Sequence, residues 1–373
     1  MKARWTTEAV YSDGGAFFSQ LEKDIDNAKS KITLETYIFS NDKLGCAVVE
    51  TLNRAARRGV KVRVMVDGIG SALSSILFLT QRLDKNIKFR VYNPLPWFLF
   101  FLPFRKFPTL THFIKGIFRI NHRNHRKTCI IDNKVAFVGG MNISAKQLEW
   151  RDAGLRVAGD DVRFLSRAFG TAWRWARFGM PLKTSLKRAS GFKPSFLVKL
   201  NDTWARRKRS YRELLNRIYL AKERIWITNA YFIPHLSLIQ SLCVAAKRGV
   251  EVKILVPQNC DLFFVPLVRA LYYNELLEAG ARIFEFIPTM LHAKTMIIDD
   301  WAILGSSNLN HRSADCDLEA DVVMTQENCK MKLAEQFLAD VTNSREMTLE
   351  SLKKRSWVKT GSGQALLLLK RWM

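Results

Sequence analysis

The chain has 373 residues, of which 48% are hydrophobic and 25% are charged. This composition excludes a disordered polymer, and the length allows two domains that each bury a core. Lys and Arg number 59 against 34 Asp and Glu, which gives a formal net charge of +25. A field of this sign attracts polyanions or an anionic membrane surface, so we expect a partner from one of these two classes.

The first 15 residues contain no apolar segment of the kind found in secretory signal peptides. No uncharged apolar stretch reaches the roughly 18 residues that a membrane-spanning helix needs. The six cysteines show no Cys-x-x-Cys spacing, which favours free thiols in a reducing compartment. We therefore expect an intracellular protein that does not span a membrane.

In chain order, the first half alternates amphipathic helical segments with apolar or alternating strands. Strands are predicted within Ala28–Phe39, Ala55–Val66 and Ile87–Tyr92, with helices between them. The octet HRKTCIID then occupies His125–Asp132. The apolar run VAFVGGMN follows it and ends at Asn142.

An insertion distinguishes the first half from the second. Gly59 and His125 are 66 residues apart, whereas the matching Gly249 and His292 are 43 apart, so the first half carries 23 extra residues. The candidate segment is Pro94–Arg119, which is rich in phenylalanine, proline and basic residues. One interpretation is a hydrophobic loop buried against the body. We favour the other, a segment at a membrane interface, because aromatic rings beside basic side chains suit the headgroup boundary.

A basic connector is predicted at 181–210, and after it the second half repeats the first. The matching segments are Ala221–Phe232, Ala245–Val256, Ala281–Phe286, the octet HAKTMIID at His292–Asp299 and the run WAILGSSN that ends at Asn308. The tail at 346–373 joins basic residues to a short leucine run. This run is too short to span a bilayer, and either an interfacial position or a docked terminal helix fits it.

The repeat predicts an α/β fold with two homologous lobes, the first at 1–180 and the second at 211–345. Strands separated by helical segments of this length favour mostly parallel sheets. Two matching lobes are expected to pack as a pseudo-twofold pair, as an isologous dimer does. A duplicated reactive cluster then predicts one active site between them.

The octets carry the candidate catalytic residues. On an extended strand His125 and Lys127 share one face, as do His292 and Lys294. Asp132 and Asp299 have the opposite parity, so we expect them to anchor the strand end or the other half. Each histidine needs a group that fixes its tautomer, and the next carboxylates downstream, Asp152 and Glu319, are assigned as these orienting acids.

Two His, two Lys and two Asn (Asn142 and Asn308) that converge on one point suit a phosphodiester. The lysines and asparagines would bind the non-bridging oxygens, one histidine would attack phosphorus and the other would protonate the leaving oxygen. The groupings typical of zinc or two-metal sites are absent, so we expect no metal and no cofactor. A lone His-x-Lys is usually a polar surface strand, but two copies at matching positions argue against that. The remaining histidines are interpreted as structural or peripheral: His112, His122, His235 and His311.

These paired motifs, each HxKxxxxD followed by Gly-Gly or Gly-Ser and an Asn, resemble those of the phospholipase D superfamily. The resemblance covers nearly the whole chain, and Glu35–Phe39, Arg57–Gly68 and Asn229–Pro234 look most like bacterial cardiolipin synthases in a short form without amino-terminal membrane helices. It implies transfer of a phosphatidyl group from phosphatidylglycerol to a second lipid, with His125 as nucleophile and His292 as general acid and base. It also places the two octet aspartates among the site residues. The expected location is the cytoplasmic face of a bacterial membrane, held peripherally on anionic phospholipid.

The sequence departs from that family pattern after the second motif, where it reads Asn308-Leu309-Asn310 and later Cys316-Asp317-Leu318-Glu319. The acceptor lipid and the oligomeric state are therefore left without a prediction. A hydrolytic phospholipase D, a phosphatidylserine synthase and an endonuclease of the same superfamily share this chemistry. The aromatic insertion argues against a nucleic-acid substrate. A catalytically inactive membrane scaffold is the weakest alternative, because neither motif has lost a residue.

Overall fold

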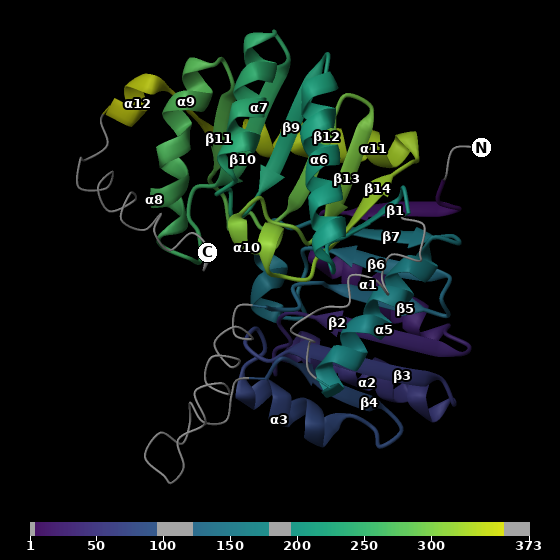
Figure 1. The fold of residues 1–373 in the computed structure, drawn as a ribbon. Coiled ribbons are helices and arrows are strands. Elements are labelled where there is room, and N and C mark those ends of the chain that lie inside the picture. Colours follow the sequence, from purple (N-terminus) through teal and green to yellow (C-terminus); the bar gives the residue numbers. More distant parts are fainter. Residues whose placement is uncertain (1–3, 95–121, 179–194, 354–373) are drawn as a thin grey trace, which may run out of the picture.

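A computed structural model describes residues 4–94, 122–178 and 195–353, which form two α/β lobes side by side (Figure 1). The first sheet has seven strands, in the order β1 (Thr7–Tyr11), β7 (Gly154–Ala158), β6 (Val135–Gly139), β5 (Thr128–Ile131), β2 (Lys31–Thr36), β3 (Lys61–Asp67) and β4 (Lys88–Tyr92). The second has eight, in the order β15 (Ser344–Met347), β11 (Arg282–Phe286), β10 (Glu251–Pro257), β9 (Arg224–Asn229), β12 (Lys294–Ile298), β13 (Trp301–Gly305), β14 (Ala320–Met324) and β8 (Val198–Leu200). The predicted pair of homologous α/β lobes is confirmed.

Both sheets are mixed, which corrects the prediction of mostly parallel sheets. Among the described strands, only β2–β3–β4 and β9–β10–β11, which helices connect, pair in parallel. The octet strands β5 and β12 run antiparallel to β2 and β9, and β6, β7, β13 and β14 continue antiparallel. A tight turn follows each octet strand and makes β6 and β13 antiparallel to β5 and β12: Asp132, Asn133 and Asp299 in these turns have φ values of 52°, 55° and 51°.

Helices cover both faces of each sheet. On the first sheet these are α1 (Gly14–Asp26), α2 (Lys43–Arg57) and α3 (Leu73–Arg82) on one face and α5 (Val162–Phe178) on the other. On the second they are α6 (Trp204–Leu220), α7 (Leu236–Lys247), α8 (Val265–Arg269) and α9 (Tyr273–Glu278) on one face and α11 (Glu327–Thr342) on the other. Shorter elements are the 3-10 turns Ala145–Glu149 and Ala270–Tyr272 and the helices α10 (His311–Asp315) and α12 (Leu349–Lys353).

The repeat extends to the ends of the helices. Gly59 after α2 and Gly249 after α7 both have a φ of 88°, a conformation that suits glycine because it lacks a Cβ. Their N–H groups donate to the carbonyls of Ala56 and Ala246 at 2.9 Å in both cases. The shared Arg-Gly-Val sequence therefore ends equivalent helices in the same way.

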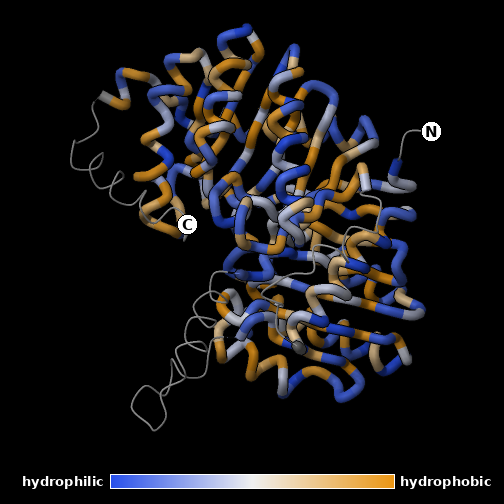
Figure 2. The backbone as a smooth tube through the Cα atoms, in the orientation of Figure 1, coloured by the Kyte–Doolittle hydropathy of each residue, from blue (hydrophilic) through white to orange (hydrophobic). Residues whose placement is uncertain are grey.

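Each lobe has a core cluster of its own, and the two lobes share a third at their junction. The cluster between α5 and α11 contains Leu165 and Phe169 from the first lobe and Leu333 and Phe337 from the second. Strand β6 contacts β13 and β14 across the junction. Figure 2 shows the apolar segments gathered inside, with hydrophilic segments outside. Burial of this shared apolar surface stabilises the pairing of the lobes.

Several predicted segments lie wholly or partly outside the described residues. These are the insertion at Pro94–Arg119 after its first residue, part of the 181–210 connector and most of the 346–373 tail. The described part of the connector contains strand β8, which pairs with β14, and the start of α6. Its basic residues from Arg206 onward therefore belong to a helix of the second lobe. All six cysteines are free thiols, as expected.

Candidate active site

The two octets meet where the lobes join. A short parallel bridge connects each octet to the segment that precedes the acid of the opposite lobe. The backbone N–H of His125 donates to the carbonyl of Leu318 at 3.0 Å, and that of His292 donates to the carbonyl of Arg151 at 2.8 Å. These two bridges are reciprocal, as twofold pairing of equivalent surfaces requires.

Each histidine is oriented by an acid from the other lobe. Nδ1 of His125 lies 3.0 Å from Glu319 Oε1, and Nδ1 of His292 lies 2.7 Å from Asp152 Oδ2. The structure therefore brings both predicted acids to the imidazoles, but crosswise rather than within a lobe. A carboxylate on Nδ1 fixes the tautomer and leaves Nε2 as the reactive ring nitrogen.

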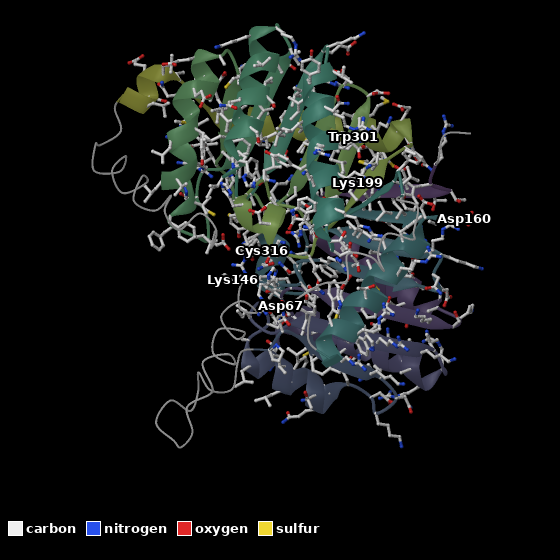
Figure 3. The ribbon with its side chains drawn as sticks, viewed as in Figure 1. Asp67, Lys146, Asp160, Lys199, Trp301 and Cys316 are labelled. Atoms are coloured by element: carbon white, nitrogen blue, oxygen red, sulfur yellow. The ribbon has the colours of Figure 1, made fainter. Side chains whose placement is uncertain are left out.

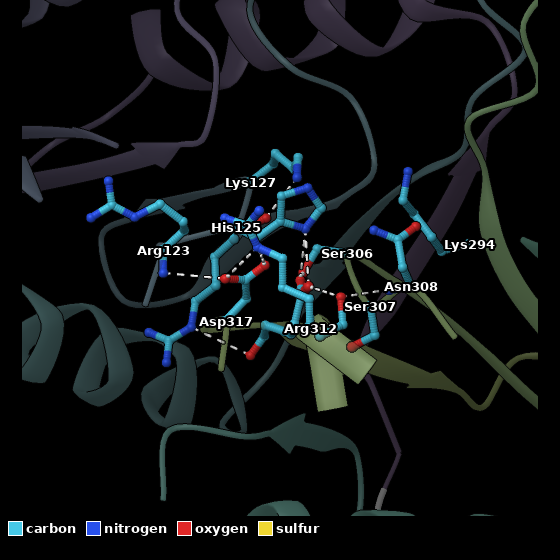
Figure 4. A network of polar contacts seen from close by, with 12 residues as sticks. Arg123, His125, Lys127, Lys294, Ser306, Ser307, Asn308, Arg312 and Asp317 are labelled. Atoms are coloured by element: carbon cyan, nitrogen blue, oxygen red, sulfur yellow. Dashed lines mark hydrogen bonds and ion pairs between the residues drawn. The ribbon is translucent and has the colours of Figure 1, made fainter. Parts of the chain in front are cut away.

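The two acids sit in different surroundings. Glu319 accepts hydrogen bonds from the hydroxyls of Ser306 at 2.5 Å and Ser313 at 2.7 Å, next to His125 (Figure 4). Burial raises the pKa of Glu319, although nearby cations oppose the shift. Burial acts in the same direction on Asp152, but the adjacent His292 and its lysine outweigh it and lower the pKa. Asp152 is thus the more firmly charged of the two.

Both octet lysines are buried beside the histidines. Lys127 Nζ donates to the carbonyl of His125 at 2.7 Å, and Lys294 Nζ donates to the carbonyl of His292. Burial lowers the pKa of Lys127 to about 7 and that of Lys294 to about 8. Burial, reinforced by these ammonium groups, also holds the pKa of His125 well below its usual value and lowers that of His292. Both imidazoles are therefore neutral at pH 7 in the free protein.

The two asparagines differ in their partners. Asn142 accepts from the N–H of Ile38 at 3.1 Å and donates to Gln147 at 2.9 Å. The buried Oδ1 of Asn308 has no hydrogen-bond partner among the described residues. An unpaired buried amide oxygen is costly, which indicates that a donor from elsewhere completes this part of the site.

Both histidines and both asparagines line a single cavity of about 180 Å³. Aromatic rings surround the imidazoles: Tyr37 lies 5.0 Å from His125, and Trp150 lies 5.3 Å from His292, centroid to centroid. The two octet histidines therefore face one shared space. Two neutral imidazoles in this cavity, with the two buried octet lysines beside them, suit attack on a phosphodiester and stabilisation of its oxygens.

The octet aspartates lie away from this cluster, at the far ends of the octet strands. Asp132 accepts the backbone N–H groups of Lys29, Ser30 and Lys31 at 2.8–2.9 Å. Asp299 accepts the equivalent three N–H groups in the second lobe at 3.0–3.1 Å. Burial alone would raise the pKa of each carboxyl, but these N–H groups outweigh it and lower the pKa. Both residues anchor the start of the neighbouring strand in their own lobe, and neither lines the cavity that the histidines share.

Sequence reasoning missed a buried ionic cluster next to the first octet. Arg123 Nη1 lies 3.5 Å from Asp67 Oδ1, and the backbone N–H of Arg123 donates to Asp317 at 3.2 Å. Arg312 donates to Asp317 at 3.0 Å, and both line the cavity (Figure 4). This cluster fixes the backbone that leads into His125. Its sequence signals were weak: Asp67 ends an apolar strand, and Arg123 lies two residues before the octet.

One group among the described residues could hold a metal ion. Ligand atoms of His235, His311 and Asp315 all lie within 4.8 Å of one another, and the two imidazole centroids are 3.9 Å apart. Two histidines that were predicted to be structural or peripheral thus meet. The group does not line the cavity that holds the octet histidines.

Comparison with known proteins identifies the family. The family model "Cardiolipin synthase, PLD-like domain" matches residues 21–162 and 214–341, which is most of the chain and both octets. The chain belongs to this family of the phospholipase D superfamily. It is 32% identical to a cardiolipin synthase of Listeria monocytogenes over 96% of this chain and 74% of that one. A cardiolipin synthase of Clostridium perfringens is 31% identical over 93% and 73%, respectively.

Solved structures support the same fold. The phosphatidylserine synthase of Haemophilus influenzae superposes with a TM-score of 0.71 at 12% identity, over 100% of this chain and 96% of that one. The polyphosphate kinase of Porphyromonas gingivalis superposes with a TM-score of 0.63 at 13% identity, and the match covers 53% of the kinase chain. Within residues 4–94, 122–178 and 195–353, none of the helices combines the length and the apolar character needed to cross a bilayer.

Proposed function

We propose that the protein is a cardiolipin synthase-type phosphatidyltransferase. It moves a phosphatidyl group from phosphatidylglycerol to the hydroxyl of a second lipid through a phosphatidyl-histidine. The observation that carries this proposal is the crosswise pair of imidazoles in one cavity, His125 with Glu319 and His292 with Asp152. The family membership and the relatives named cardiolipin synthase support the choice of substrate.

In the first step Nε2 of His125 attacks phosphorus and the bond to the glycerol oxygen breaks. A protonated His292 donates its proton to that oxygen, and glycerol leaves. His125 suits the nucleophile because its pKa is held well below the usual value, so its ring nitrogen stays unprotonated. His292 suits the proton carrier because the firmly charged Asp152 stabilises its imidazolium form. The bound phosphodiester anion raises the pKa of His292 further.

In the second step the now neutral His292 takes the proton of the incoming hydroxyl. The hydroxyl oxygen attacks phosphorus, the P–N bond to His125 breaks, and the phosphatidyl group is transferred. We place the phosphoryl oxygens beside Lys127 and Lys294, whose ammonium groups lie next to the histidines and neutralise the charge that develops there. The unpaired Oδ1 of Asn308 can accept a hydrogen bond from the entering hydroxyl. Water in place of the alcohol gives hydrolysis by the same steps.

A lipid substrate requires access from a membrane surface, which we place at the cytoplasmic face of a bacterial membrane. Leu262 and Phe264 line the catalytic cavity, and Phe263 between them is 79% exposed. An exposed phenylalanine between two residues of the cavity wall is suited to the headgroup boundary, while the charge of +25 attracts anionic lipid.

Mass spectrometry of lipids from a cardiolipin-deficient bacterial host that expresses the protein tests the proposal. We expect diphosphatidylglycerol to appear with the wild-type chain and to be absent with His125→Ala. Accumulation of phosphatidic acid alone would instead identify a hydrolase. Accumulation of neither product, with the protein folded and present, contradicts the proposal.

A further inference from the structure

The second lobe contains a cavity whose counterpart in the first lobe is filled by side chains. This cavity, of about 160 Å³, lies between helix α6 and the second sheet. The equivalent space in the first lobe, between α1 and the first sheet, measures about 20 Å³. The two helices occupy matching places, since α1 packs on α2 as α6 packs on α7. The difference between two copies of one architecture therefore comes from side chains.

The residues responsible are identified by the repeat. Phe17 fills the first-lobe space and contacts Phe137, with ring centroids 5.4 Å apart. Phe17 also covers Gly154 so closely that a Cβ there would lie 2.4 Å from the ring. With Ala28–Phe39 matched to Ala221–Phe232, Phe17 corresponds to Ser210 in α6. With Val135–Gly140 matched to Trp301–Ser306, Phe137 corresponds to Ile303. Two large rings are thus replaced by a hydroxymethyl group and a smaller aliphatic chain.

The cavity is mainly apolar inside. Its apolar walls come from Leu214, Leu238, Met296, Trp301 and Ile303. Two of the three acids that line it are paired at its wall: Asp321 accepts from the N–H and the hydroxyl of Ser307, and Glu213 forms an ion pair with Lys199 at 2.7 Å. The third, Glu319, accepts from Ser306 and Ser313. Figure 3 labels Lys199 and Trp301 beside α6 in the second lobe. Such a space offers little to water, which needs two to four polar partners.

The cavity adjoins the catalytic residues. Lys294 and Glu319 contribute to its wall, and it shares Asn308, Asn310 and Ser313 with the cavity that holds both histidines. The two spaces are therefore neighbours, so a chain attached to a phosphate between the histidines begins close to this cavity. Because a cavity of about 150 Å³ accommodates a molecule the size of benzene, this one accepts a segment of roughly six carbon atoms.

From this asymmetry we infer that the second-lobe cavity binds a segment of a hydrocarbon chain of the phospholipid substrate. This inference rests on the proposed lipid activity. It assigns the two lobes different tasks: both supply catalytic groups, but only the second holds a chain. The lobe with Phe17 is closed by its own side chains, and the lobe with Ser210 is open for the ligand.

Trp301 provides a direct readout in the wild-type protein. We expect phosphatidylglycerol with brominated acyl chains to quench the fluorescence component that Trp301→Phe removes, because bromine quenches indole on contact. The control is the same lipid without bromine on its acyl chains. Equal fluorescence of the Trp301 component with both lipids overturns the inference, whether or not the protein proves to make diphosphatidylglycerol.

A filling variant tests the role in turnover. Ser210→Phe installs the residue that the first lobe carries, and Ala205→Phe adds the same ring at an exposed position of α6. We expect Ser210→Phe to lower kcat/KM for a long-chain phosphatidylglycerol at least tenfold relative to kcat/KM for bis(4-nitrophenyl) phosphate. Ala205→Phe should leave this ratio at the wild-type value.

The melting curve of Ser210→Phe shows whether this variant is folded. If it is folded and the ratio is unchanged, the inference is overturned. If it does not fold, the Trp301 measurement decides. Failure of the wild-type chain to make diphosphatidylglycerol, with quenching intact, counts against the proposed function alone.

Discussion

The chemical difference between the two histidines lies in their acids. Replacing Glu319 by Gln or Asp152 by Asn keeps the shape of each contact and removes its charge. We expect both variants to lose about 10²-fold or more in kcat with a natural lipid. With a 4-nitrophenyl leaving group, which needs no proton, the loss in Asp152→Asn should shrink, while the loss in Glu319→Gln should persist. Equal losses with both leaving groups would refute the assignment of His292 as the proton donor.

The buried lysines give the activity a characteristic pH dependence. Burial lowers their pKa values to about 7 for Lys127 and about 8 for Lys294, so the ammonium charges disappear as pH rises from 7 to 9. We expect kcat/KM, which reports the free enzyme, to fall over this range rather than near the usual lysine pKa.

Loss of fold does not explain that fall. The unfolded chain holds these lysine protons to higher pH, so the two lysines contribute stability that increases between pH 7 and 9. Circular dichroism at pH 9 should therefore show a folded protein. A kcat/KM that stays constant to pH 9 would contradict the placement of both lysines at the phosphoryl group.

At the residue scale, duplication marked the histidines, asparagines and acids that the structure brings together, and their catalytic roles stay predictions. The sequence did not predict which acid meets which histidine. Which acid meets which histidine depends on how the two lobes pack together. The positions of Asp152 and Glu319 along the sequence carry no information on that packing. The sequence also grouped Asp132 and Asp299 with the catalytic residues by resemblance, whereas their strand parity correctly pointed to anchoring.

At the scale of elements, each octet aspartate holds the start of a neighbouring strand. We expect Asp299→Ala to lower the free energy of unfolding by about 1–2 kcal/mol, because three backbone N–H groups lose a charged acceptor in a partly exposed turn. Its kcat should stay near the wild-type value. The adjacent, exposed Asp300→Ala is the matched control and should change neither quantity. A large loss of kcat in Asp299→Ala without loss of stability would restore a catalytic role for this residue.

The order of strands and helices followed from periodicity, but the direction of the strands did not. The predicted parallel segments are real in β2–β3–β4 and β9–β10–β11. The strands after the octets reverse because tight turns follow Ile131 and Ile298, and the Asp132-Asn133 pair was the available sequence signal. The start of α6 was interpreted as linker because its high density of Lys and Arg concealed its apolar positions.

At the scale of the whole molecule, the exposed Phe263 beside the catalytic cavity suits contact with a membrane. We expect Phe263→Ser to weaken sedimentation with phosphatidylglycerol vesicles about tenfold, since one phenylalanine no longer enters the interface. Phe196 is equally exposed, 80% against 79%, but neither of its chain neighbours lines the catalytic cavity, as both neighbours of Phe263 do. Phe196→Ser should therefore bind as the wild type does. Equal binding by both variants would place the membrane contact elsewhere on the protein.

The pairing of two lobes around one phosphorus can be tested by trapping the covalent intermediate. His292→Ala protein, given a phosphatidyl ester of 4-nitrophenol, lacks the base for the second step and should accumulate the intermediate. Rapid acid-free quenching and peptide mass spectrometry should then locate a phosphatidyl group on His125 and none in His125→Ala protein. A variant that releases nitrophenol over many turnovers with no adduct on either octet histidine, or with an adduct on a residue outside the octets, would contradict the mechanism.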